Sequence, residues 1–400
     1  MVIRNSQRSR GKVLCANPPS GALLPPTISL FSGAGGLDIG LEQAGYETRV
    51  CVEWEETRCA TLKQNRPHWA VINGDIRKFS TKQILAEAGL KKGEAALVVG
   101  GPPCQAFSKS AFWVPGRIES ILDDPRAHLL KEYVRVVKDA RPRAFIMENV
   151  FGLAYKTSRP ALDATIHALS SEGYVIAEKV VNAADYGVPQ RRERLLLVGV
   201  LGGPKFHFPP PTHAPPDRVA RLTEMAPYVT AGDAIGDLDD GNALAGEVIG
   251  GKYGHLLEMI PPGENYLHLT AKKGHKHPLF EWRSKYWSFL LKLSPDQPSW
   301  TIQASPGPYV GPFHWRNRRL RIPEVKRIQT FPDDWQLAGS RSEQWAQIGD
   351  AVPCLLAERI GHALREQVFD APLQVKHVTK ARRPDAQRRR RATKQLDLGL

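Results

Sequence analysis

The chain has 400 residues, of which 42% are hydrophobic and 24% are charged, a balance typical of globular proteins. No apolar run approaches the roughly 18 residues of a membrane-spanning helix, and the N-terminus lacks the apolar core of a signal peptide. The five cysteines form no Cys-x-x-Cys pair and no spacing with histidine that is typical of zinc. The sequence therefore predicts a cytoplasmic protein with no membrane partner, no disulfide framework and no metal.

The net charge of +14 is concentrated at the two ends of the chain. Residues 1–20 contain four basic residues and no acid, and residues 376–400 contain nine basic residues against two acids. We expect a disordered basic leader over 1–24 and a disordered basic tail over 373–400. Such segments can lie along the phosphates of a nucleic acid, although a charge run that only aids solubility is an equally good interpretation.

The first predicted elements form a strand, a glycine turn and a helix. Residues 27–31 are an apolar strand, residues 32–38 are rich in glycine, and a helical pattern begins at Ile39. Glycines let the backbone approach a ligand at the N-terminus of a helix, as in nucleotide-binding turns. The turn therefore indicates a cofactor site, although its glycines do not have the full dinucleotide spacing.

A second predicted strand, residues 48–52, ends in Glu53 and Trp54. An acid at this distance from the glycine turn is placed to accept hydrogen bonds from the two hydroxyls of a ribose. Both NAD and S-adenosylmethionine satisfy this geometry, so the residues alone leave the cofactor open.

The apolar run 95–99 leads into the sequence Gly-Gly-Pro-Pro-Cys-Gln-Ala-Phe-Ser, which contains Cys104. Two glycines and two prolines end the predicted strand sharply, and a cysteine buried in a core does not need such a turn. We expect the thiol to be presented at the carboxyl end of a parallel sheet, where open α/β folds bind their ligands.

Two further predicted strands carry charged residues at their ends. Residues 144–147 form a strand that is followed by Glu148, and Arg192 and Arg194 come immediately before the strand at 195–200. A carboxylate at the end of the strand next to the cysteine strand lies on the same side of the sheet as the thiol.

Taken together, these segments resemble the DNA (cytosine-5) methyltransferase family of bacterial restriction–modification type. The resemblance rests on Gly-Pro-Pro-Cys-Gln-x-Phe-Ser, on Phe-Ser-Gly-Ala-Gly-Gly-Leu-Asp followed by a strand-terminal Glu, on Glu-Asn-Val and on Gln-x-Arg-x-Arg. It covers about residues 27–368, with the motifs in the family's common order. It implies an α/β fold, with a Rossmann-like S-adenosylmethionine-dependent methyltransferase sheet and a second, smaller target recognition domain.

The resemblance also implies residue roles. Cys104 would attack C6 of a cytosine, Glu148 would bond N3 and the exocyclic amine, Arg194 would contact O2 and Arg192 would support the site. Asp75 would bond the adenine of the cofactor, and Asp350 stands where the family usually has Asn, so that it can accept a hydrogen bond but cannot donate one as an amide does. The implied cofactor-binding residues are Phe31, Gly33, Gly35, Gly36, Glu53, Trp54, Asp75, Ile76, Gly101, Asp350, Ala351 and Val352.

The length predicts two domains, and a proline-rich stretch beginning near residue 204 marks their boundary. We expect a catalytic and cofactor-binding domain over 25–204, a target recognition domain over 205–342, and a segment over 343–372 that completes the catalytic domain. Tryptophans interleaved with basic residues between 272 and 321 suit contact with nucleic acid, or the core of a small domain. The implied partner is double-stranded DNA, together with a cognate restriction endonuclease for the same site, and the enzyme would be a monomer.

Three other functions share some of these features. An RNA cytosine-5 methyltransferase would have the same motifs, but a recognition region of this length favours duplex DNA. A catalytically silent DNA-binding regulator would not need Cys104, Glu148 and Arg194 together. An NAD dehydrogenase on a similar sheet is disfavoured by the incomplete dinucleotide spacing.

Overall fold

The computed structural model describes residues 24–103, 128–155, 158–219, 224–281 and 286–370. Cys104 lies outside the described residues, as do nearly all of the leader and the tail. Within the described ranges, no helix is both long and apolar enough to cross a membrane.

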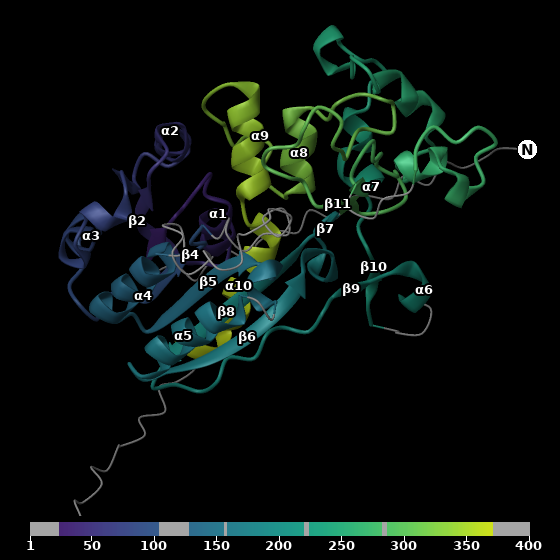
Figure 1. Ribbon diagram of the computed structural model, residues 1–400. Helices are drawn as coiled ribbons and strands as arrows, with labels where there is room; N and C mark the ends of the chain where they lie inside the picture. The colour runs from purple at the N-terminus through teal and green to yellow at the C-terminus, as the bar shows by residue number, and fades with distance from the viewer. Residues whose placement is uncertain (1–23, 104–127, 156–157, 220–223, 282–285, 371–400) are drawn as a thin grey trace, which may run out of the picture.

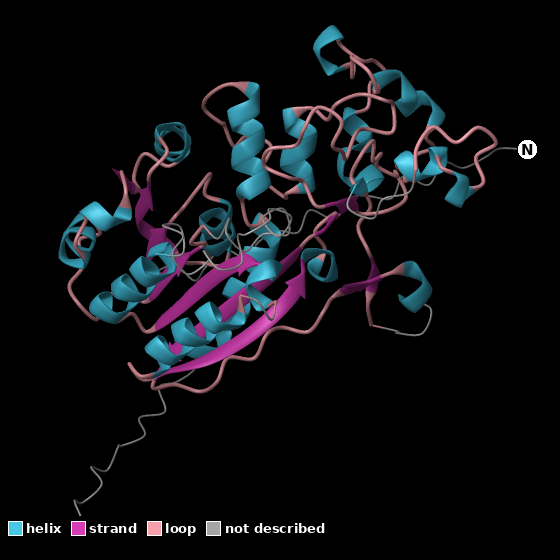
Figure 2. Ribbon diagram, in the orientation of Figure 1, coloured by secondary structure: helices cyan, strands magenta, loops and turns pink. Residues whose placement is uncertain are grey.

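A seven-stranded sheet forms the centre of the molecule, with the strand order β3-β2-β1-β4-β5-β8-β6 (Figure 2). All neighbouring strands are parallel except where β8 pairs with β5 and β6, so β8 runs opposite to the rest. The strands are β1 (Pro26–Leu30), β2 (Glu47–Glu53), β3 (Ala70–Asn73), β4 (Leu97–Gly100), β5 (Ala144–Val150), β6 (Tyr174–Asn182) and β8 (Glu193–Leu201).

The strand order reverses between β1 and β4, since the chain goes from β1 outward to β2 and β3 and then returns to the other side of β1. A reversal of this kind leaves a crevice outside the carboxyl ends of the two strands, which is where open α/β sheets bind ligands. The glycine turn follows β1, and the turn that leads to Cys104 follows β4. The fold therefore brings the two predicted loops to the same place.

Helices cover both faces of the sheet, because the strand residues alternate between two apolar clusters. Val98 faces one cluster with α3 (Thr81–Glu87), α4 (His128–Ala140) and α5 (Arg159–Ser170), whereas Leu97 and Val99 face the other with α1 (Gly36–Gln43) and α10 (Cys354–Leu364). In Figure 1, α4 and α5 lie on the near face of the sheet and α10 lies behind it. This three-layer arrangement confirms the predicted α/β fold with a Rossmann-like sheet.

Helix α10 packs closely against α1, although more than 300 residues separate them in the chain. A Cβ added at Gly40 would lie 2.2 Å from the carbonyl oxygen of Cys354, and one added at Gly361 would lie 2.8 Å from the Cβ of Ala44. Only glycine permits this approach of the two backbones. The C-terminal helix α10 thereby returns to α1, the helix that follows the glycine turn.

A separate, smaller core is formed by buried residues between Ile249 and Phe313, and the described residues 245–281 and 286–313 are here called the small lobe. Aromatic side chains meet edge to face in it, with ring centroids 5.2–6.2 Å apart among Tyr253, Tyr266, Phe280, Phe289 and Tyr309. Its helices are short 3-10 turns, namely η7 (Ala245–Glu247), η8 (Gly254–Met259), η9 (Tyr266–Leu269) and η10 (Ala271–Lys273). Such turns give no sustained helical or strand period, which explains the poor periodicity of this stretch.

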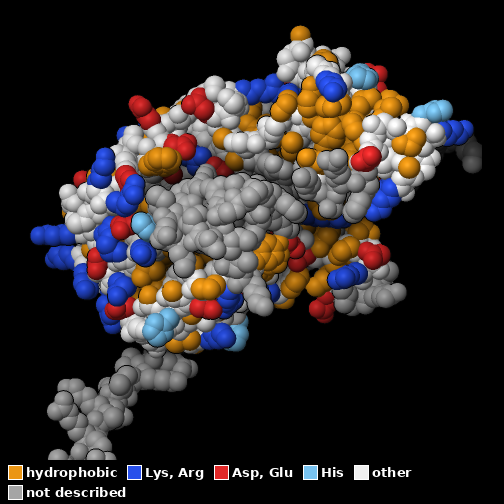
Figure 3. All heavy atoms as spheres, in the orientation of Figure 1, with side chains coloured by type: hydrophobic (Ala, Val, Ile, Leu, Met, Phe, Trp, Pro, Cys, Tyr) orange, Lys and Arg blue, Asp and Glu red, His pale blue; other side chains and the backbone are white. Residues whose placement is uncertain are grey.

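A third apolar cluster joins the small-lobe side of the chain to the sheet. It combines Ile39, Leu62 and Trp69 from the sheet side with residues of α7 (Ala231–Ile235), α8 (Ile322–Ile328) and α9 (Arg341–Asp350). The remaining elements are α2 (Glu56–Asn65), β7 (Gln190–Arg191), β9 (His213–Ala214), α6 (Pro216–Val219), β10 (Ala226–Pro227) and β11 (Ser299–Trp300). Figure 3 shows hydrophobic side chains gathered on the surface over this end of the molecule.

Some boundaries differ from those predicted. Strand β5 continues to Val150 because it pairs with β8 along its whole length, so Glu148 lies within the strand and not after it. Helix α10 begins at Cys354 within the predicted segment 343–372 and is followed by a π-helix, Arg365–Phe369. Pro323 is accommodated because it lies in the first turn of α8, where its missing N–H leaves no helical hydrogen bond unmade.

Candidate active site

The carboxylate of Glu148 lies directly against the turn that follows β4. Gly100 pairs with Met147 in the sheet, so Glu148 is the next residue along β5 toward the crevice. A Cβ added at Gly101 would lie only 2.9 Å from Oε2 of Glu148. The second glycine of the motif therefore leaves room for the acid, three positions before Cys104.

Glu148 is paired with Arg194. The Nε atom of Arg194 lies 2.8 Å from Oε1 of Glu148, and the two side chains are only 11% and 10% exposed. The pair forms because β8 runs antiparallel to β5 and places Arg194 opposite Val150. Burial raises the pKa of Glu148, and the nearby guanidinium groups of Arg194 and Arg192 offset this only in part. A carboxyl group in this setting holds a proton more readily than an exposed one does.

Asn149 fastens the turn that leads to Cys104, a role that the sequence analysis did not assign to it. Its Nδ2 donates a hydrogen bond of 3.0 Å to the carbonyl of Pro102, and the side chain is buried. The sequence signal that could have indicated this role is the amide side chain directly after Glu148. The same strand thus supplies both the acid and an anchor for the cysteine turn.

Arg192 is fully enclosed, and its guanidinium is held by backbone carbonyl groups. Its guanidinium donates to the carbonyls of Ile302, Gly349 and Ala351 at 2.7–3.1 Å. It therefore ties the strand that carries Arg194 to two segments of chain more than 100 residues away. This arrangement suits a supporting residue and not one that contacts a substrate.

Two glutamines continue this connection, and the sequence analysis gave neither a role. Gln190 donates to Oε1 of Gln329 at 2.6 Å and accepts from the backbone N–H of Ile302 at 3.0 Å. Gln329 in turn donates to the carbonyls of Ile348 and Ala351, both at 2.9 Å. Both glutamine side chains are fully buried, so the network holds the strand end, the small-lobe side and the C-terminal segment in one arrangement.

The predicted cofactor turn is built around Glu53. Its carboxylate accepts hydrogen bonds from the backbone N–H of Gly33 at 2.7 Å and of Trp54 at 2.9 Å. Gly33 and Gly35 have positive φ values of 57° and 83°, which glycine adopts without strain. Phe31, at the start of the turn, also has a positive φ, of 55°. These bonds fix the glycine turn beside the end of β2.

The C-terminal segment closes one side of this turn. A Cβ added at Gly36 would lie 2.4 Å from the carbonyl oxygen of Val352 and 3.1 Å from the Cβ of Ala351. Asp350, the residue before, accepts a hydrogen bond of 2.7 Å from Nη2 of Arg58 on α2. The structure thus brings together the predicted cofactor residues from the two ends of the resemblance.

The remaining predicted cofactor residues lie beside the same turn. Gly74, after β3, donates its N–H to the carbonyl of Glu53, and the side chain of Trp54 is 67% exposed. Asp75 caps the 3-10 helix η1 (Ile76–Lys78) and is engaged by Arg77, whose hydrogen bonds lower the pKa of the carboxyl group. In this structure Asp75 therefore makes the capping interaction, and Ile76 is buried beneath it.

The glycine turn fits an adenosine cofactor by two tests. Among the described residues, and leaving out the chain neighbours of Gly33, only Nη1 of Arg58 lies within 4 Å of its Cβ position, so the turn has an open side that a larger residue would fill. The acid of β2 is a carboxylate with two oxygens, which is the acceptor that a ribose requires. No group of three or more metal-binding side chains occurs among the described residues.

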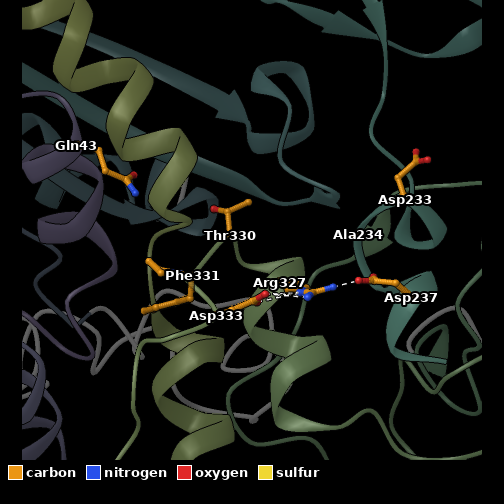
Figure 4. Close-up of a pocket in the computed structure, with 9 residues that line it drawn as sticks. Gln43, Asp233, Ala234, Asp237, Arg327, Thr330, Phe331 and Asp333 are labelled. Carbon is orange, nitrogen blue, oxygen red and sulfur yellow. Dashed lines mark hydrogen bonds and ion pairs between the residues drawn. The ribbon is translucent and has the colours of Figure 1, made fainter. Parts of the chain in front are cut away.

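A separate pocket of about 480 Å³ lies where the C-terminal end of α1 faces α7 and α8 (Figure 4). Its cation, Arg327, is already paired with Asp237 and Asp333 at 2.7 Å. Its lining includes neither Glu148 nor the glycine turn, so it is not part of the candidate active site.

The chain shares its fold with solved structures of other proteins. The Dnmt2 methyltransferase of Schizosaccharomyces pombe matches 86% of this chain and 99% of its own, with a TM-score of 0.58 and 15% identity. At that identity the likeness shows the fold alone, which is an α/β fold with a Rossmann-like sheet.

Comparison of sequences identifies the family. The profile described as C-5 cytosine-specific DNA methylase matches residues 26–366. The Type II methyltransferase M.SacI of Streptomyces achromogenes is 45% identical over 368 residues, covering 86% of this chain and 93% of the relative. M1.HphI of Haemophilus parahaemolyticus is 34% identical over 348 residues, covering 84% and 86%.

The chain belongs to the C-5 cytosine-specific DNA methylase family. It is a DNA (cytosine-5)-methyltransferase, and membership of the family implies S-adenosylmethionine as the methyl donor. The predicted resemblance is thereby confirmed, and an NAD dehydrogenase is excluded.

Proposed function

We propose that the enzyme methylates C5 of a cytosine in a specific double-stranded DNA sequence, through a covalent bond between Cys104 and C6 of the base. The observation that carries the proposal is the Glu148–Arg194 pair, which lies against Gly101 and next to the anchored carbonyl of Pro102. The turn that continues to Cys104 therefore begins at the acid and the arginine.

C5 of cytosine is a poor nucleophile, so electrons must first be pushed onto it. The Cys104 thiolate adds to C6, and Glu148 gives or shares a proton at N3, for which its raised pKa is suited. Arg194 stabilises O2. S-adenosylmethionine supplies an electrophilic methyl group on its sulfonium. After C5 has taken the methyl group, a base removes the C5 proton, the sulfur leaves C6 with its electron pair, and N3 returns its proton to Glu148, which restores the neutral aromatic base.

The target atom is stacked inside duplex DNA, so the nucleotide must turn out of the helix before the thiol can reach it. In this proposal Arg192 is a positioning residue, since its guanidinium donates to backbone carbonyls and is fully buried. The cofactor would bind Glu53 through its ribose and lie along Phe31, Gly33, Gly35 and Gly36. Trp54, Asp75 and Ile76 would line the adenine side, and Gly101, Ala351 and Val352 would complete the pocket.

The same proposal covers organisation and partners. The relatives are named Type II methyltransferases, so we expect a restriction endonuclease that acts on the same site. We propose a monomer in the bacterial cytoplasm, with catalytic residues 25–204 and 343–372 around a target recognition domain at 205–342. The cluster that joins α8 and α9 to Ile39 and Trp69 would form the junction of the two domains.

Replacing Cys104 by Ala tests the covalent step. We expect Cys104→Ala to abolish methylation and to leave S-adenosylmethionine binding intact, whereas Cys15→Ala, outside every motif, should keep full activity. The wild-type enzyme should form a denaturation-resistant adduct with duplex DNA that carries 5-fluorocytosine, and the variant should not. Methylation by Cys104→Ala would remove the proposed nucleophile, and preferential methylation of transfer RNA in a parallel assay would show that RNA is the substrate.

A further inference from the structure

One arginine beside the glycine turn has no place in the mechanism so far. Arg58 lies on α2, and its side chain is only 15% exposed. Two of its three nitrogens are occupied, since Nε donates to Glu55 at 2.8 Å and Nη2 donates to Asp350 at 2.7 Å. The third, Nη1, makes no hydrogen bond to any described residue and lies 3.9 Å from the Cβ position of Gly33.

The surroundings keep Arg58 positively charged. Burial acts to lower its pKa, but the carboxylates of Asp350, Glu53 and Glu55 together raise the pKa above its ordinary value. A guanidinium held at two of its corners loses little further freedom when the third corner binds a ligand. Its free N–H groups are therefore pre-oriented toward the open side of the glycine turn.

Asp350 offers the opposite charge at the same place. Its Oδ2 accepts from Arg58, and its Oδ1 has no hydrogen-bond partner among the residues that the structure describes. The residue directly precedes the segment that packs against Gly36. A free donor on Arg58 and a free acceptor on Asp350 thus lie side by side, each with a full charge.

This combination matches an α-amino acid, which carries one carboxylate and one ammonium group on the same carbon. We infer that Arg58 and Asp350 together bind the amino-acid end of S-adenosylmethionine, with Nη1 of Arg58 donating to its carboxylate and Oδ1 of Asp350 accepting from its ammonium. The inference rests on the proposed cofactor site. It also gives a physical reason for Asp at position 350, because an ionised Asp both holds Arg58 and attracts the ammonium group, whereas Asn would carry no charge for either.

The test compares two cofactors that differ only in the carboxylate. Dissociation constants for S-adenosylmethionine and for its decarboxylated analogue are measured by calorimetry on the full chain. For Arg58→Gln we expect S-adenosylmethionine to bind about 10- to 100-fold more weakly than to the wild type, since a charge-assisted hydrogen bond is lost. Binding of the decarboxylated analogue should change by less than about twofold, because it has nothing for Arg58 to hold.

Three further variants keep the result interpretable. Lys63→Gln removes an exposed positive charge from the same helix and should leave both constants unchanged. Arg58→Lys keeps the charge without the forked geometry and should give an intermediate loss for S-adenosylmethionine only. Asp350→Asn should weaken S-adenosylmethionine and leave an analogue without the α-amino group nearly unaffected.

Equal losses for S-adenosylmethionine and the decarboxylated analogue in Arg58→Gln would show that Arg58 only supports the turn, and no loss would show that it does not reach the cofactor. Either result would overturn the inference while wild-type binding and the Cys104 adduct remained as proposed. Failure of the wild type to bind S-adenosylmethionine would instead refute the cofactor site itself, and this inference with it.

Discussion

At the scale of single residues, the geometry of the site depends on positions where the neighbouring atoms leave no room for a side chain. Gly100 and Gly101 are adjacent, yet they are glycines for different reasons. A Cβ at Gly100 would lie 2.5 Å from the backbone oxygen of Leu30 in the next strand, whereas a Cβ at Gly101 would meet the end of the Glu148 side chain. The first contact is with a rigid sheet, and the second is with a group that can be pushed aside.

This difference predicts that a substitution at Gly101 changes the methylation rate, whereas one at Gly100 changes the stability of the fold. Gly101→Ala should fold with a melting temperature close to that of the wild type, but should lose about 100-fold in methylation rate because the carboxylate is displaced. Gly100→Ala should fail to fold stably, since the neighbouring strand would have to shift. Single-turnover methylation and thermal melting of both variants check this. Methylation by Gly101→Ala within about twofold of the wild type would show that the position of Glu148 is not critical.

Asp38, in the first turn of α1, is a second residue whose surroundings decide its behaviour. It is completely buried, and neither carboxylate oxygen has a hydrogen-bond partner of normal geometry. Burial raises its pKa to about 7, which the Ser29 hydroxyl offsets only in part. Since the unfolded chain releases this proton near pH 4, the folded state binds more protons between pH 4 and 7, and stability must fall as the pH rises through that window.

Asp38→Asn removes the group that titrates. We expect the free energy of unfolding of the variant, relative to the wild type, to improve by roughly 2–3 kcal/mol between pH 5 and pH 8, because each pKa unit corresponds to about 1.4 kcal/mol. Denaturant titrations at both pH values measure it, with Glu87→Gln, at an exposed position on α3, as the control for the loss of one carboxylate. A difference between Asp38→Asn and the wild type that does not vary with pH would show that Asp38 is ionised throughout.

At the scale of elements, helix α8 is positioned by a buried ion pair. Both nitrogens of the Arg318 fork bond to Glu324, at 2.7 and 2.9 Å, and neither side chain is exposed. Glu324 also accepts from the backbone N–H of Arg321, at the start of α8. One side chain therefore caps the helix and neutralises the arginine that precedes it.

Breaking this pair leaves a charge buried without a partner. Glu324→Gln should lower the free energy of unfolding by about 3–5 kcal/mol, and the loss should be visible in denaturant titrations and as faster proteolysis. Glu172→Gln, which breaks an exposed pair with Lys138, should cost less than about 1 kcal/mol. Equal effects of the two substitutions would contradict a special role for the buried pair.

At the scale of the whole molecule, the site is assembled from segments far apart in the chain. The glycine turn, the acid on β5, the arginines before β8 and the segment after α9 converge because of the strand order and because α10 returns to α1. Arg192 and the two glutamines hold these parts together. A movement of the small-lobe side relative to the sheet would therefore displace both Glu148 and the glycine turn.

Much of this was within reach of the sequence. Strands and glycine turns are local, so the alternation of apolar residues and the positions of Gly33, Gly35 and Gly101 predicted the sheet and its loops. The motifs around Cys104, Glu148 and Arg194 predicted the family, and the comparisons confirmed it. The small lobe had no period to follow, because short 3-10 turns around an aromatic core leave none.

The sequence by itself determined the class of sheet and the family, and it predicted the residues that we propose to carry the chemistry, because these depend on short-range patterns of polarity and turn geometry. Only the tertiary structure decided that Arg192 faces backbone carbonyls, that Asn149 anchors the cysteine turn, and that Arg58 meets Asp350 beside Gly33. Those contacts join residues 47 to 292 positions apart, and nothing in a local pattern says which distant groups folding will place within hydrogen-bonding distance.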